Sequence, residues 1–230
     1  MDTLGDDLLL LAIDPKRGRV RAVHLVRYGL MGAELIRLVA SELVLIKDGR
    51  LVVAEPATAT GDLQLDTALA SIADASKPPK PKSWASKPRR GIVTGYLTKL
   101  ANAGKIHRSA GTRARWQVAD QAGLATARAR LDAIAVGTGP VDLEQAAYGG
   151  LAHALQLDRL LYRGWDNRAV RKRMKEIAQG KWTAPAAEPA DAAIRAEQAA
   201  ISAATQAAIT AAIDAAVHAA TAAAAAASSG

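Results

Sequence analysis

Apolar residues recur along most of the chain at the spacing of one helix face. Leu8 to Ala12 is apolar on every side, and Thr3 followed by Asp6 is an arrangement that caps a helix start, so a buried first helix is predicted. An apolar stripe predicts a second helix over 28–41. Further helices are expected over 62–72, over 90–103, from a cap at Asp120 to Gly137, over 140–157 and over 167–179.

Two segments carry the pattern of β-hairpins. Asp48-Gly49 separates two apolar, partly β-branched runs, which is a strong signal for a two-residue turn. A second hairpin is expected over 105–118, with 109–112 at its tip. The Lys-Pro segment 77–82 is expected to be an extended surface loop, because proline disrupts a helix interior. Helices do not alternate regularly with strands, so the fold class is mainly α with two hairpins.

The composition changes to alanine after Pro189. Asp214 and the weak apolarity of alanine argue against a membrane span in this region. We expect a domain over residues 1–182 and an Ala-rich helical extension over 183–230. The extension is predicted to pack a narrow stripe on the body, formed by Ile194, Ile201, Ile209, Ile213 and Val217.

The composition excludes several kinds of chemistry. The chain has no cysteine, which excludes disulfides, thiolate nucleophiles and zinc–thiolate sites. Its start carries Asp2, Asp6 and Asp7 instead of the basic residues of a secretory signal, so we expect a cytoplasmic location. Asp6 and Asp7 would point about 100° apart on a helix, which suits its N-terminal dipole better than a catalytic pair.

No catalytic, metal-binding or cofactor-binding motif stands out. The histidines are scattered without metal-ligand spacing, and Gly104-Lys105 and Gly180-Lys181 lack the rest of a phosphate-binding loop. Nucleophile-elbow and dinucleotide-binding motifs are missing as well. We therefore expect a protein that is not an enzyme, with no catalytic residue, no metal ligand and no cofactor.

Positive charge is concentrated in the middle of the sequence. The net charge is +8, and the segment 75–118 has no acidic residue. A solvated surface usually mixes both signs, so this segment predicts a face for an anionic partner. Its cations are Lys77, Lys80, Lys82, Lys87, Arg89, Arg90, Lys99, Lys105, Arg108, Arg113 and Arg115; a smaller basic group comprises Lys16, Arg17, Arg19, Arg21 and Arg27.

Several stretches together resemble the Golgi phosphoprotein 3 family in its short bacterial form. They are residues 4–12, 28–35, 60–69, 100–106, 151–154 and 171–180, and the Thr60-Gly61-Asp62 stretch is the most specific. The resemblance extends to about Trp182. It implies a compact helical domain around a central helical bundle, and a peripheral membrane protein. Eukaryotic members bind phosphatidylinositol 4-phosphate and act as adaptors that retain Golgi enzymes.

The head-group pocket of the family uses one Trp and three Arg. The resemblance places these positions on Ala22, Met31, Arg90 and Val93, so only Arg90 is retained. Neighbouring residues could substitute, and Trp84 is expected either at a membrane interface or packed beneath the loop. The lipid-binding residues that we predict are Arg90, Arg89, Lys87, Arg21, Arg27 and Trp84.

Two alternatives to binding of anionic membrane lipid remain. A helix over 90–103 followed by a hairpin with Arg108, Arg113 and Arg115 is typical of nucleic-acid binding. However, Lys99 is the only charged residue between Gly91 and Gly104, which supplies a groove-reading face poorly. The second alternative is a protein adaptor without lipid binding, in which the Pro-Lys loop or the Ala-rich helix contacts a cargo. The sequence leaves the oligomeric state open.

Overall fold

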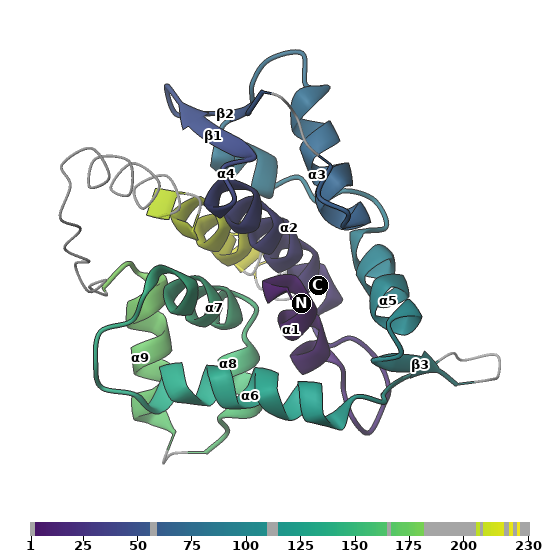
Figure 1. The fold of residues 1–230 in the computed structure, drawn as a ribbon. Helices are drawn as coiled ribbons and strands as arrows, with labels where there is room; N and C mark the ends of the chain where they lie inside the picture. Colours follow the sequence, from purple (N-terminus) through teal and green to yellow (C-terminus); the bar gives the residue numbers. More distant parts are fainter. Residues whose placement is uncertain are drawn as a thin grey trace, which may run out of the picture.

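The fold in the computed structural model is mainly helical, as predicted (Figure 1). The structure describes residues 3–55, 59–109, 115–164 and 167–181, and residues 206–207, 209–218, 221–222 and 225 of the C-terminal segment. The helices are α1 Leu4–Ala12, α2 Val23–Ala40, α3 Leu63–Ala73, α4 Pro81–Ala85, α5 Ile92–Asn102, α6 Gln121–Val136, α7 Leu143–Ala154, α8 Leu157–Leu161 and α9 Arg168–Ala178. Two antiparallel hairpins pair β1 Val44–Lys47 with β2 Arg50–Val53, and β3 Ile106–Arg108 with β4 Trp116–Val118.

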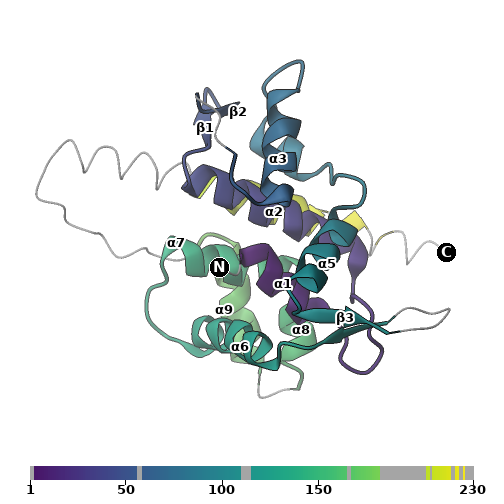
Figure 2. The same ribbon diagram turned by 45° about the vertical axis from the view of Figure 1, so that its right-hand side comes forward.

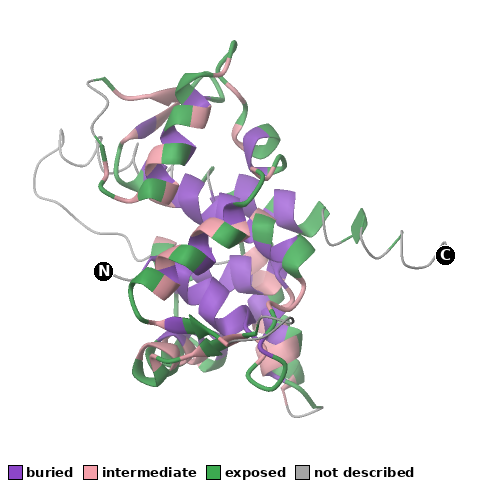
Figure 3. Ribbon diagram, turned by 90° about the vertical axis from the view of Figure 1, so that its right-hand side faces the viewer, coloured by how far each residue is buried: buried purple, intermediate pink, exposed green. Residues whose placement is uncertain are grey.

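Helices α1 and α2 form the centre of the molecule (Figure 1), and the buried residues gather at this centre (Figure 3). Thr3 Oγ1 accepts a hydrogen bond from the Asp6 N–H at 3.2 Å, and Asp6 Oδ2 accepts one from the Thr3 N–H at 3.0 Å, so the predicted capping box is confirmed. Residues 5–12 are all buried, as a helix that is apolar on every side requires. A Cβ added at Gly29 would lie 2.7 Å from Leu155, so this glycine lets the end of α7 approach α2.

Helix α2 begins five residues earlier than predicted. Ala22 adopts a left-handed conformation with φ 45°, and the helix starts at Val23. Leu25 and Val26 are buried and extend the apolar stripe, whereas Arg27 next to them is exposed. The sequence pattern did not reveal this start, because Val23 and His24 are exposed and Ala22 provides no side-chain cap.

Helices α6, α7, α8 and α9 form the half of the molecule below α2 in Figure 1. Asp120 caps α6, as predicted, by accepting the Gly123 N–H at 2.7 Å. The helix predicted over 140–157 is α7, which is shorter at both ends, and the short helix α8 begins where the predicted helix was expected to end. Asp142 caps α7, and Gln156 in a left-handed conformation with φ 59° separates α7 from α8.

Hairpin β1–β2, α3 and α4 form the opposite half (Figure 1). The predicted Asp48-Gly49 turn is confirmed, with φ values of 50° and 68° and Lys47 paired with Arg50. The prediction that 77–82 is entirely extended is wrong, because Pro81 is the first residue of α4. Proline fits this position since the first N–H of a helix needs no intrahelical acceptor.

The described part of the C-terminal segment is helical and lies along α2 (Figures 1 and 2). Ile209 and Ile213 are buried as predicted, but Val217 is 40% exposed, so its predicted place in the packed stripe is wrong. Small residues make up much of the buried face instead, and a Cβ added at Gly32 would lie 2.7 Å from Ala212. The predicted stripe residues 194 and 201 and most of the second hairpin's tip, 110–112, lie outside the described residues.

Candidate functional site

The turn over residues 86–91, which joins α4 to α5, holds three of the predicted lipid-binding cations. Pro88 and the left-handed Gly91, with φ 76°, shape this turn, because a residue before proline avoids helical conformation and glycine accepts positive φ. Lys87 and Arg90 are exposed. Their side chains make no hydrogen bond or ion pair within the described part of the chain, so both charges are available to a partner.

The N-terminus of α5 adds to the positive potential of this turn. No side chain caps it, and its first turn contains no acidic residue. The first N–H groups of a helix lack intrahelical acceptors and carry a partial positive charge. The turn over 86–91 therefore combines two free cations with a helix end that favours anions.

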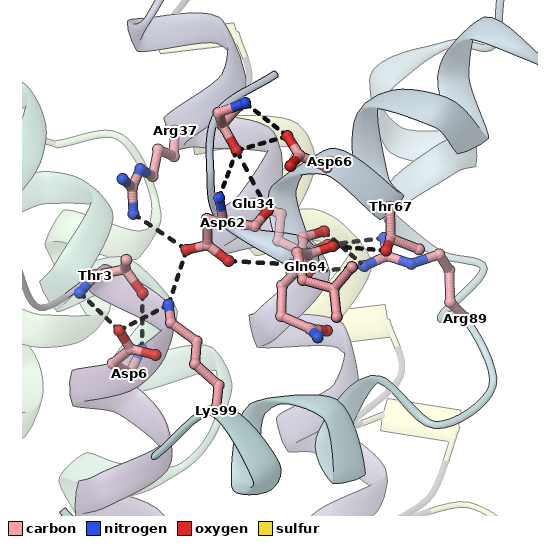
Figure 4. Close-up of polar contacts among 12 residues, drawn as sticks. Thr3, Asp6, Glu34, Arg37, Asp62, Gln64, Asp66, Thr67, Arg89 and Lys99 are labelled. Carbon is pink, nitrogen blue, oxygen red and sulfur yellow. Dashed lines mark hydrogen bonds and ion pairs between the residues drawn. The ribbon is translucent and has the colours of Figure 1, made fainter. Parts of the chain in front are cut away.

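Arg89 points inward toward Glu34 (Figure 4), whereas Lys87 and Arg90 are exposed. Its Nη2 donates to Glu34 Oε1 at 2.8 Å, and its Nη1 lies 2.8 Å from Oε2 without making a hydrogen bond to that atom. The Glu34 side chain is fully buried in α2, and Met31 Sδ lies 3.5 Å from Nη1. Burial raises the pKa of Glu34 to about 7, and the hydrogen bond and charge of Arg89 only partly oppose this rise.

Lys99 of α5 joins the Thr-Gly-Asp stretch to the first helix (Figure 4). Its Nζ lies 3.0 Å from Asp6 Oδ2 and 2.8 Å from Asp62 Oδ2. Arg37 of α2 lies 3.7 Å from the same Asp62 oxygen. Desolvation raises the pKa of Asp62, but the hydrogen bonds and charges of its neighbours outweigh it, and the net shift is downward. This cluster fastens α1, α2 and α5 to the start of α3.

The second acidic residue of α1, Asp7, has its partner on α6. Asp7 Oδ2 lies 2.6 Å from Arg130 Nη1, and Glu144 lies 2.6 Å from Arg130 Nη2. Burial raises the pKa of Asp7 to about 6, although the charge of Arg130 acts in the opposite direction. The pair Asp6 and Asp7 therefore serves two separate ion-pair networks.

The other predicted lipid-binding residues lie apart from the turn over 86–91. Arg21 Nη2 forms an ion pair with Asp14 at 2.9 Å in the connection between α1 and α2. Arg27 is exposed on α2, with its guanidinium 5.1 Å from the ring centre of Tyr28. Trp84 is buried and its indole N–H donates to Ser71 Oγ at 3.0 Å, so it packs beneath the loop, the second of the two expected placements.

Carboxylates from elsewhere cover part of the acid-free segment. Besides Arg89 and Lys99, Lys82 is paired, with its Nζ 3.3 Å from Asp214 of the C-terminal segment. Arg113 lies outside the described residues. The cations that remain exposed and without an ion pair in the described ranges are Lys77, Lys80, Lys87, Arg90, Arg108 and Arg115.

The partner of Arg89 was not predicted from the sequence. A signal was present, because Glu34 is the only acidic residue of α2 and stands between apolar positions. A carboxylate on a buried helix face needs a cation or a proton, so a long-range pair could have been expected. Nothing in the pattern, however, indicates which of the many cations it meets.

A model of the Golgi phosphoprotein 3 (GPP34) family matches residues 4–196 of the chain. The match extends beyond residue 182, where the sequence places the domain boundary, and that boundary stays a prediction. No curated protein matches the chain significantly. Within the described residues, none of the helices combines the length and apolarity that crossing a bilayer requires.

Proposed function

Because the chain belongs to the Golgi phosphoprotein 3 family, we propose that it attaches reversibly to membranes containing anionic phospholipid through Lys87 and Arg90. The turn over 86–91 is the observation that carries this proposal. Both cations are exposed there without an ion pair among the described residues, beside the uncapped N-terminus of α5.

The magnitude of the attraction fits reversible attachment. Each Lys or Arg close to an anionic bilayer surface contributes about 1 kcal/mol. Lys87 and Arg90 supply two such charges, and the exposed Lys77 and Lys80 lie on the segment that precedes α4. A few cations of this kind give binding that salt weakens, because charges near the bilayer are screened.

The family ligand, phosphatidylinositol 4-phosphate, is the specific lipid that we propose to test first. Arg90 would meet its phosphate directly. Arg89 could join only if the lipid competed with Glu34, whose carboxylate already holds that guanidinium. We therefore expect a modest preference for this lipid over others of the same charge.

In this proposal the protein is a non-enzymatic, cytoplasmic adaptor at the membrane surface. Its family is not known for an enzymatic activity. The turn over 86–91 lies on the side of α5, whereas α6 and α9 lie on the other side of α2 (Figure 1). A protein cargo could thus bind the latter helices while the turn faces the lipid.

Co-sedimentation with vesicles tests the proposal. The double variant Lys87→Gln with Arg90→Gln should lose binding to vesicles of phosphatidylcholine with phosphatidylserine or phosphatidylinositol 4-phosphate. A matched control, Lys172→Gln with Lys175→Gln on α9, removes the same charge from exposed residues elsewhere and should bind as the wild type does. Equal loss in both variants would show that net charge alone drives attachment, and unchanged binding of the first variant would refute the assignment. Binding to duplex DNA with a steep salt dependence, without vesicle binding, would favour the nucleic-acid alternative.

A further inference from the structure

A basic pocket lies between the α1–α2 connection and α8, away from the turn over 86–91. Its volume is about 540 Å³. The cations that line it are Lys16, Arg17 and Arg21 from the connection and Arg159 and Arg163 from α8 and the residues after it. The first three of these are close together in the sequence, but nothing in the sequence indicates that Arg159 and Arg163, far along the chain, lie beside them.

The acidic residue of this pocket, Asp14, pairs with only one of these cations, Arg21. Asp14 Oδ1 accepts the N–H groups of Lys16 and Arg17 at 2.8 and 2.9 Å, and Oδ2 pairs with Arg21. The hydrogen bond from the Arg17 N–H is the largest cause that lowers the pKa of Asp14, to about 2. The side chains of Lys16, Arg17, Arg159 and Arg163 make no ion pair within the described ranges.

A second cavity, of about 480 Å³, also borders Arg21, and its lining is mainly apolar but includes the polar side chains of His107, Gln117, Gln121 and Arg128. It opens between the end of α1, hairpin β3–β4, α6 and α8. Arg21 lines both this cavity and the basic pocket, so the two adjoin at its side chain. The apolar side chains that face the cavity include Leu11, Ile13, Trp116, Val118, Leu124 and Leu161.

We propose that the two spaces together bind one amphipathic anion, with a single apolar chain in the cavity and a phosphate monoester on the cations. A phosphate monoester carries a charge of about −1.5 to −2 and three acceptor oxygens. It can therefore engage several Arg and Lys side chains at once, whereas a carboxylate ligand offers only a single charge and two oxygens. Both volumes fall within the range of about 300–1,000 Å³ that is usual for ligand pockets. The ligand is a dissolved molecule held inside the protein, so the inference goes beyond docking on a bilayer.

Isothermal titration calorimetry with alkyl phosphates below their critical micelle concentrations tests whether the cavity binds the alkyl chain of the ligand. Affinity should rise from ethyl to octyl to dodecyl phosphate, by up to about fourfold for each methylene group that becomes fully buried. Inorganic phosphate and dodecanol, which supply the head alone and the chain alone, should each bind much more weakly. If inorganic phosphate binds as tightly as dodecyl phosphate, or if dodecyl phosphate does not bind, the inference is wrong.

Variants separate the two halves of the site. The double variant Arg159→Gln with Arg163→Gln should bind dodecyl phosphate about tenfold more weakly or worse, because two charge-assisted contacts are lost. Leu124→Trp fills the cavity and should reduce the affinity for dodecyl phosphate while leaving that for ethyl phosphate unchanged. A thermal melt checks that this variant folds, and the chain-length series on the wild type decides the matter if it does not.

The control is Lys87→Gln with Arg90→Gln, which should bind dodecyl phosphate as the wild type does. Loss of vesicle binding in that variant with retained alkyl phosphate binding would support both proposals. Vesicle binding without alkyl phosphate binding would overturn this inference alone. If Arg159→Gln with Arg163→Gln binds dodecyl phosphate normally, the phosphate does not lie on these cations and the inference fails.

Discussion

Replacing Arg89 by methionine removes the cation that faces the buried carboxylate of Glu34. Methionine keeps much of the apolar stem, so the change mainly removes charge. The Glu34 side chain is fully buried, and that of Arg89 is 17% exposed. Breaking a buried pair by removing one member costs about 3–5 kcal/mol, because the remaining charge has no compensation. We expect about 3 kcal/mol, the lower end, since Arg89 retains some contact with solvent.

The cost should depend on pH in a definite direction. Burial already raises the pKa of Glu34 from 4.5 to about 7, and loss of Arg89 would raise it further. Below the unfolded value of 4.5 the carboxyl is protonated in both states, and a neutral acid needs no cation. The destabilisation caused by Arg89→Met should therefore be small at pH 4.5 and should grow as the pH rises through 7 and above.

Urea unfolding followed by far-UV circular dichroism at several pH values measures this cost. Arg90→Met is the matched control, because its side chain is exposed without an ion pair among the described residues. Exposed substitutions of this kind change stability by about 0.5 kcal/mol or less. If Arg89→Met costs no more than Arg90→Met at pH 8, the buried pair does not stabilise the fold as argued here.

Three further predictions concern the core. Asp7 and Glu34 have folded-state pKa values of about 6 and about 7, above their unfolded values of 3.8 and 4.5. The folded protein therefore binds more protons than the unfolded chain at mildly acidic pH, and this stabilisation is lost as the pH rises through the folded-state values. The urea concentration at the midpoint of unfolding should fall between pH 5 and pH 8. Lys99→Met leaves two carboxylates without their shared cation and should cost about 3 kcal/mol in urea unfolding, whereas Lys87→Met should cost almost nothing. Gly32→Ala inserts a methyl group 2.7 Å from a side chain of the C-terminal helix and should cost about 1–3 kcal/mol, seen as a lower melting temperature; an unchanged melting temperature would show that this helix moves aside freely.

Local interactions made several elements predictable. The capping box of Thr3, the Asp120 cap and the Asp48-Gly49 turn each involve residues within a few positions of one another, so their chemistry is visible in the sequence. The left-handed conformation of Gln156 was not visible, because glutamine, unlike glycine, asparagine or aspartate, is not a residue type that signals positive φ.

The candidate site was predictable only in part. The sequence placed Lys87, Arg89 and Arg90 in one basic segment, and the structure puts two of them at the surface. It could not indicate that Arg89 turns toward Glu34, because that contact joins a residue of α2 to a turn residue 55 positions later in the chain. The contact depends on how α2 lies against the turn over 86–91, which periodicity does not determine.

Both carboxylates of α1 find their cations far downstream, on Lys99 and Arg130. A ribosome that has just delivered the first helix has therefore delivered an apolar segment with two acidic groups whose counter-charges are not yet synthesised. Nascent segments of this kind expose apolar surface and are prone to aggregate. We expect both acidic groups of α1 to remain without these partners until residue 130 has left the ribosomal tunnel. The synthesis of α6 would then determine how early α1 can complete its ion pairs and become fully buried.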